Sequence, residues 1–121
     1  MKIDVDYRDG AAIFRVQGRI NLDTARALDD KVKHSLEAGG PAVLELSGVD
    51  YCASAGIGVM VSIHSEYRLG LAGLSQAVRS VLELSEVIRL LNHFDTVEQA
   101  VAYVTSPVAR PGYTAGAQPP A

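Results

Sequence analysis

The sequence predicts a single α/β domain that opens with a β-hairpin and continues with alternating helices and strands. Three observations support this: residues 3–8 alternate apolar and charged side chains, Asp9-Gly10 follows them, and residues 25–36 carry apolar residues at helical spacing. A strand, a helix and a second strand in that order favour a right-handed crossover between parallel strands. The length of 121 residues fits one domain of ordinary size.

The opening hairpin is predicted from residue alternation and from its turn. Residues 3–8 have the period of two that is typical of a half-buried strand. Asp9-Gly10 is among the strongest short hairpin signals, because both positions of a tight turn need positive φ angles. Residues 13–16 form the second strand, which we expect to end at Gly18.

A helix and a buried strand follow the hairpin. Asp23 or Asn21 can cap the helix. Gly39-Gly40 ends it. Residues 42–46 form a short apolar run of the kind found in buried parallel strands, and Ser47-Gly48 is expected to break that strand.

The remaining elements are predicted from caps and short apolar runs. A second helix is expected over residues 55–67 and a strand over residues 69–72. Ser75 is a suitable N-cap for a third helix. Residues 87–91 fit either an edge strand or a turn of helix. Thr96 with Gln99 forms a capping box for the last helix.

A change of composition near residue 106 predicts the domain boundary. Residues 1–105 are expected to fold, and residues 106–121 are expected to form a flexible tail rich in proline and glycine. An alternative is a docking tail anchored by Tyr113.

Composition excludes several classes of function. The chain has 48% hydrophobic and 21% charged residues with a net charge of -3, which gives no electrostatic reason to expect nucleic acid or an anionic membrane as partner. Its single cysteine, Cys52, allows no internal disulfide, which fits a reducing, cytoplasmic location. The start lacks the apolar run of a signal peptide, and no segment approaches the ~20 apolar residues of a membrane helix. We therefore expect no direct nucleic-acid binding and no membrane insertion.

The most informative segment is the passage from the buried strand at residues 42–46 to the second helix. It brings Ser54 to a helix N-terminus, where unpaired N–H groups and the helix dipole favour negative charge. Ser54 can cap the helix with its hydroxyl, the interpretation that we favour, or it can carry a phosphate. Gly56 and Gly58 lack side chains, so another chain can approach closely.

Four segments in order carry a resemblance to a known family. They are Gly18-Arg19-Ile20-Asn21, Glu45-Leu46-Ser47-Gly48-Val49, Ala53-Ser54-Ala55-Gly56-Ile57-Gly58 and Leu71-Ala72-Gly73-Leu74-Ser75. Over about residues 3–104 the chain resembles the STAS domain family, in particular the bacterial anti-sigma factor antagonists. The resemblance implies a single STAS-like α/β domain with a mixed four- to five-stranded sheet, opened by a β-hairpin, and about four helices packed mainly on one face.

The chain departs from the family pattern at the expected phosphorylation site. The family usually carries its phosphate on the serine directly before the first glycine, and this position is Ala55. The preceding aspartate of the family is Ala53, so only Ser54 keeps a hydroxyl. The usual phospho-switch therefore does not carry over, and we expect binding that is always on. The stretch from Gly58 to Leu69 is also shorter than the family pattern suggests.

The resemblance implies a protein-binding regulator and no enzyme. The expected partner is an anti-sigma factor, which can itself be a serine kinase, and its binding controls transcription indirectly. An alternative is a STAS accessory subunit of a membrane transporter complex, with an ATPase or a permease as partner. The implied binding surface comprises Asn21, Asp23, Thr24, Ala53, Ser54, Ala55, Gly56, Ile57 and Gly58.

The other reactive residues suggest no chemistry. Cys52 is predicted to be a buried, inert thiol, and His34, His64 and His93 are predicted to be surface or interface residues. Their spacing matches no zinc site and gives Ser54 no catalytic triad. The sequence therefore predicts no catalytic residue, no metal and no cofactor.

Overall fold

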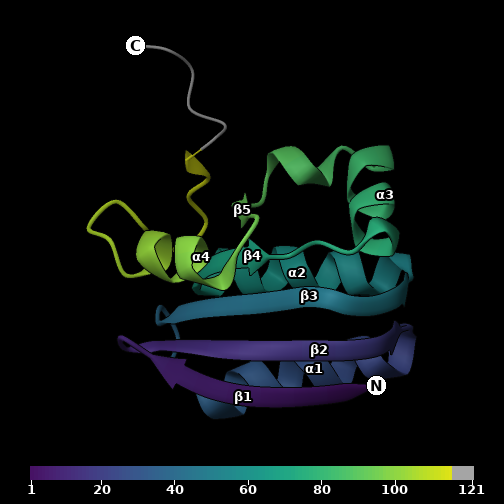
Figure 1. Ribbon diagram of the computed structural model, residues 1–121, viewed down its shortest axis with the longest axis horizontal. Coiled ribbons are helices and arrows are strands. Elements are labelled where there is room, and N and C mark those ends of the chain that lie inside the picture. Colours follow the sequence, from purple (N-terminus) through teal and green to yellow (C-terminus); the bar gives the residue numbers. More distant parts are fainter. Residues whose placement is uncertain (116–121) are drawn as a thin grey trace.

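A five-stranded mixed sheet forms the centre of the computed structural model, which describes residues 1–115 (Figure 1). The strands are β1 (Lys2–Arg8), β2 (Ala11–Ile20), β3 (Pro41–Cys52), β4 (Arg68–Ala72) and β5 (His93–Phe94), and they lie in sequence order. β1 and β2 pair antiparallel across the Asp9-Gly10 turn, and the other neighbours are parallel. The mixed sheet and its opening hairpin are confirmed.

Helices cover both faces of the sheet, most of them on one face. They are α1 (Leu22–Ser35), α2 (Ser54–Glu66), α3 (Gln76–Leu84) and α4 (Val97–Val104), with a 3-10 turn, η1 (Val87–Arg89), between α3 and β5. Buried residues of α1, α2 and α3 share the larger hydrophobic core, whereas α4 packs on the opposite face in a smaller one (Figure 1). Three of the four helices therefore lie on one face, as the resemblance implied.

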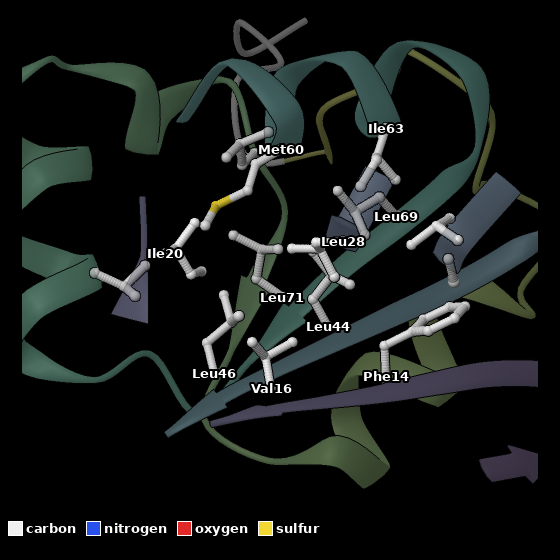
Figure 2. Close-up of a cluster of buried hydrophobic side chains, with 14 of the residues drawn as sticks. Phe14, Val16, Ile20, Leu28, Leu44, Leu46, Met60, Ile63, Leu69 and Leu71 are labelled. Carbon is white, nitrogen blue, oxygen red and sulfur yellow. The ribbon is translucent and has the colours of Figure 1, made fainter. Parts of the chain in front are cut away.

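The larger core follows from the alternation of side chains along the strands. Every second residue of β2, β3 and β4 points toward α1 and α2, where Leu28, Met60 and Ile63 meet them. Figure 2 shows these side chains converging. The strand residues of this core include Phe14, Val16, Leu44, Leu46, Leu69 and Leu71, which are all buried.

Two strands run further than the sequence indicated. β2 continues past Gly18 to Ile20, and β3 continues through Ser47-Gly48 to Cys52. The register shifts between Arg15 and Gln17 and again between Gly18 and Arg19. At such irregular positions a strand tolerates residues, here the glycines, that are unfavourable in regular pairing, and the strand continues past them. Both strands therefore run directly to the helices that follow them.

The region after α3 resolves an alternative that the sequence left open. Residues 87–89 form a turn of 3-10 helix, η1, and residues 87–91 contain no strand. The edge strand is β5, two residues further along the chain, where His93 and Phe94 pair with Leu71 and Ala72.

Residues 106–115 lie against the domain, in place of the flexible tail expected from residue 106. We call this segment the C-terminal strap. The side chain of Asn92 donates to the carbonyl of Tyr113 at 2.9 Å and accepts from the N–H of Ala115 at 2.9 Å. The N–H of Gly112 donates to the carbonyl of His64 at 2.7 Å. Polar contacts hold the strap, which is why a search for apolar patterns missed it. The rest of the predicted tail, residues 116–121, lies outside the described residues.

His64 is buried beneath this strap, which corrects its assignment as a surface or interface residue. Its side chain is 7% exposed, and Nε2 lies 3.1 Å from Oγ1 of Thr114. Because the Thr114 hydroxyl donates to the carbonyl of Leu90, Nε2 of His64 is assigned as the donor. Nδ1 is then buried without a partner among the described residues.

Stability is expected to fall on acidification because of this histidine. Burial lowers the pKa of His64, against a smaller opposing contribution from the backbone of Gly112. Below about pH 6.5 this histidine binds a proton in the unfolded chain more readily than in the folded chain. The contribution of neutral His64 to the free energy of unfolding is therefore complete above that pH and is lost as the pH falls further. We expect His64→Gln to lose less stability than wild type between about pH 7 and pH 5, as measured by urea unfolding.

His34→Gln is the control, since His34 is exposed on α1. The pKa of His93 is also lowered, mainly by burial. His93 therefore also makes stability fall with falling pH, and it does so equally in wild type and in His64→Gln. Identical pH slopes for wild type and His64→Gln would contradict this role for His64.

Candidate functional site

The N-termini of α1 and α2 lie side by side at the carboxyl edge of the parallel strands. β2 ends at Ile20 and β3 ends at Cys52, and these two residues are partners in the parallel register. The N–H of Ala53 also donates to the carbonyl of Ile20 at 2.8 Å. The two segments of the predicted binding surface therefore come together, at the edge where open α/β sheets usually place their sites.

Asn21 caps α1, which decides between the two candidates. Its side chain accepts from the N–H of Thr24 at 3.0 Å, and Oγ1 of Thr24 accepts from the N–H of Asn21 at 2.8 Å. This reciprocal capping box satisfies two backbone donors. The Thr24 hydroxyl donates to the carbonyl of Arg19 at 2.7 Å. Asp23 stays exposed in the first turn, where its charge favours the helix dipole.

Ser54 is not the N-cap of α2, contrary to the interpretation favoured from sequence. Because β3 extends to Cys52, the helix starts one residue earlier, Ala53 occupies the cap position, and Ser54 is the first helical residue. No side-chain hydrogen bond caps this end. Ser54 is exposed, Ala55 is half-buried, and the first turn contains no acidic residue. The dipole of α2 therefore meets no negative side chain in that turn.

The two glycines of this helix have different roles. Gly58 is exposed, and a Cβ atom there would meet nothing within 4 Å. Gly56 is buried, and a Cβ atom there would lie 2.8 Å from Sγ of Cys52 and 2.8 Å from Cγ2 of Ile20. Gly56 therefore lets α2 approach the strand ends and offers no free surface, which corrects its assignment to the partner-binding set. Gly58 leaves the surface open.

A groove of about 300 Å³ separates α1 from α2 next to these residues. Leu22, which is 56% exposed, stands at its mouth, and Val59 joins Ala55 and Gly58 along its other side. Tyr51 is 41% exposed at the end of β3, with the guanidinium of Arg19 4.2 Å from its ring centroid. Sequence reasoning missed Tyr51 and Val59, because an exposed apolar residue resembles a core residue until its surroundings are known. Ile57 is half-buried and packs against the larger core.

Cys52 is buried beneath this surface, as predicted. Burial raises the pKa of its thiol, so the reactive thiolate is disfavoured. Within residues 1–115, no three histidine, cysteine, aspartate or glutamate side chains gather into a group that could hold a metal. None of the helices in that range is both long and apolar enough to span a membrane.

Comparisons with known proteins assign the family. The family model described as STAS domain matches residues 2–100. The Bordetella bronchiseptica protein BtrV, which bears the name of an anti-sigma factor antagonist, is 31% identical over 108 residues, covering 84% of this chain and 93% of BtrV. The crystal structure of an anti-sigma factor antagonist from Mycobacterium paratuberculosis has a TM-score of 0.76 at 23% identity, with 87% of this chain and 94% of that one covered.

A transporter domain shares the fold less closely. The STAS domain of a SulP transporter from Vibrio cholerae has a TM-score of 0.58 at 17% identity, with 80% of this chain and 82% of that one covered. Identity at this level shows a common fold only. Together, the family model, the relative from Bordetella and the sheet topology show that this chain belongs to the STAS domain family and resembles its anti-sigma factor antagonists.

Proposed function

We propose that this chain is a protein-binding regulator that binds an anti-sigma factor in the cytoplasm and thereby controls transcription indirectly. The observation that carries the proposal is the exposed surface around the two adjacent helix N-termini, in a chain related to an anti-sigma factor antagonist over most of its length. No catalytic step is part of the proposal. We call this surface the helix-start face and define it as Asn21, Asp23, Thr24, Ala53, Ser54, Ala55, Ile57 and Gly58, with Leu22 and Val59 at its groove.

The chemistry of the helix-start face suits a neutral, partly apolar partner surface. Leu22, Ala55 and Val59 offer apolar contact area, while the unneutralised N-terminus of α2 favours an acidic or carbonyl-bearing group on the partner. The open surface at Gly58 lets the partner approach the helix backbone. The capping box of Asn21 and Thr24 holds the neighbouring loop in one conformation, which reduces the entropy lost on binding.

A side chain introduced at Gly58 is expected to block the partner without disturbing the fold. Gly58→Arg adds a long side chain to an exposed helical position with nothing within 4 Å of its Cβ, so the thermal midpoint is expected to stay near that of wild type. Binding of an anti-sigma factor from the same organism is expected to weaken at least tenfold, or about 1.4 kcal/mol, by isothermal titration calorimetry.

Ala27→Arg is the matched control, since Ala27 is exposed on α1 and does not line the groove. Its affinity for the partner is expected to equal that of wild type. The function would be refuted if no anti-sigma factor of the organism bound the wild-type chain.

We further propose that the usual phospho-switch is absent at Ala55 and that Ser54 is the remaining candidate acceptor. Ala55 has no hydroxyl, so phosphate cannot be added at this position. The Ser54 side chain is exposed and does not cap the helix, so a kinase has access to its hydroxyl. A phosphate there adds about -1.5 to -2 charges, which a neutral interface has to desolvate.

Ser54→Asp is therefore expected to weaken partner binding at least tenfold, and Ser54→Ala is expected to keep it within about twofold of wild type. Titration calorimetry with the same anti-sigma factor measures both affinities. Equal affinities for the two variants would remove Ser54 as a switch while leaving the binding function intact. If the partner is a serine kinase, incubation with ATP and mass spectrometry of the chain would show whether residue 54 gains a phosphate.

The transporter alternative has less support, since its only observation is a shared fold with the SulP domain. An ATPase or permease that bound the helix-start face in place of an anti-sigma factor would establish it.

A further inference from the structure

A cavity of about 790 Å³ lies beside β5, at the edge of the sheet opposite the hairpin. α3, η1, β5, α4 and the C-terminal strap each contribute residues to its lining. Its volume is within the range of small-molecule sites, roughly 300–1,000 Å³. No residue of the helix-start face lines it, so the cavity is separate from the proposed partner surface.

One side of this cavity carries guanidinium groups. Arg79 on α3 is half-buried and makes no ion pair with any residue in the range 1–115. Arg89 on η1 is exposed, and its only ion pair within residues 1–115 is with Glu86 at 3.8 Å, a surface pair that contributes little. Glu83 is the one carboxylate of the lining and is exposed at the rim. Arg79 is therefore available to bind a carboxylate with both of its terminal nitrogens.

Another side of the cavity is aromatic. The rings of Phe94 and Tyr103 lie 5.4 Å apart at an angle of 33°. The Tyr103 hydroxyl is buried and has no hydrogen-bond partner in the described chain, although the Asn92 side chain lies beside it. The hydrogen bonds of Asn92 go to the strap instead. Because this hydroxyl has almost no exposed surface, the part of Tyr103 that lines the cavity is its ring.

His93 lines the same cavity as Arg79. Its pKa is lowered, first by burial and then by the positive charge of Arg79, while Asp95 and Glu83 act in the opposite direction. An anion bound at Arg79 would favour the charged imidazolium and raise this pKa. The titration of His93 is therefore a direct reporter of an anion in the cavity.

We propose that this cavity is a binding site for a small aromatic carboxylic acid. The carboxylate pairs with the guanidinium of Arg79, and the ring packs against Phe94 and Tyr103. Thr114 and Ala115 of the strap form part of the wall, so a bound acid also stabilises the docked strap. The site is independent of the proposed function, since neither needs the other.

Three probes separate the charge from the ring: 1-naphthoate has both, 1-naphthalenemethanol has only the ring, and acetate has only the carboxylate. Titrations of the full ¹⁵N-labelled chain, followed by NMR, give affinities and locate the site. We expect 1-naphthoate to bind at least tenfold more tightly than either other probe and to shift the amides of Arg79, His93 and Tyr103. It is also expected to raise the pKa of His93, as measured from its ring proton shifts.

Two variants test the role of Arg79 separately from folding. Arg79→Gln is expected to bind 1-naphthoate at least tenfold more weakly than wild type. Arg79→Lys keeps the positive charge but loses the two parallel N–H donors of the guanidinium, so its affinity is expected to lie between those of Arg79→Gln and wild type. Arg8→Gln is the control, because Arg8 lies on β1 at the far edge of the sheet and does not line the cavity, and its exposed pair with Glu98 contributes little. The proposal is overturned if 1-naphthoate shows no saturable binding, if Arg79→Gln binds it as wild type does, or if the shifted amides lie away from the cavity.

Discussion

Gly56→Ala is expected to lower the free energy of unfolding by about 1–3 kcal/mol, although glycine-to-alanine changes inside helices usually stabilise. The added Cβ would lie 2.8 Å from Sγ of Cys52 and 2.8 Å from Cγ2 of Ile20. Ile20 is β-branched and fully buried at the end of β2, so it has little freedom to move. α2 has to shift outward, which displaces the helix-start face. Urea unfolding measures the loss of stability.

Gly58→Ala is the matched control on the same helix. A Cβ atom at this position has open space around it, so the gain in helix propensity remains, and stability is expected to rise by about 0.5–1 kcal/mol. If the two alanine substitutions change the free energy of unfolding in opposite directions, the difference has to come from the surroundings of the two positions, because the substitution and the helix are the same. A stabilising Gly56→Ala would show that α2 does not approach the strand ends as closely as described.

Asn92→Ala is expected to lower the free energy of unfolding by about 2–3 kcal/mol, because it removes two hydrogen bonds at once. Asn92 is 7% exposed, and its amide bridges the carbonyl of Tyr113 and the N–H of Ala115. Without it, the end of the strap loses its polar partners and is expected to detach. Hydrogen exchange is expected to accelerate at Gly112 and Ala115 and to stay unchanged in β2 and β3.

Asn92→Asp is a sharper variant of the same change. The carboxylate can still accept from the N–H of Ala115 but cannot donate to the carbonyl of Tyr113 at neutral pH. We expect a loss of stability at least as large as for alanine, since a buried charge is added. Thr105→Ala serves as the control for a nearby exposed residue whose side-chain bond is local to α4. A strap that stays protected from exchange in Asn92→Ala would show that its apolar contacts, such as buried Ala109, are sufficient.

Local patterns in the sequence were sufficient to predict the four helices, the first four strands and their order, but not the short edge strand β5. The alternation in residues 3–8, the Asp9-Gly10 turn and the capping box at Thr96 are each confirmed. These signals depend on interactions between residues a few positions apart, so they are present whatever the rest of the chain does. The ends of β2 and β3 were placed too early in the sequence analysis. Gly18 and Ser47-Gly48 disfavour a regular strand, but they are tolerated where the pairing of β2 with β3 is irregular.

The sequence predicted that the two segments of the candidate site lie together, but not the structural role of each residue. The pairing of β2 with β3 brings Asn21 and Ser54 to one edge, as the family pattern implied. Whether Ser54 caps its helix depends on where the strand before it ends. Whether Gly56 faces solvent depends on Ile20, which is 36 positions earlier in the chain. Neither fact is encoded in the six residues of the motif.

The sequence by itself determined the α/β class, the opening hairpin, the family and the missing hydroxyl at Ala55, because these depend on residue identities and on short-range order. Only the tertiary structure decided that Ser54 is free of capping, that Gly56 serves packing, and that the strap closes over His64 and Asn92. Each of these results comes from contacts between residues far apart in the sequence, whose geometry is set when the sheet pairs and the helices pack upon it.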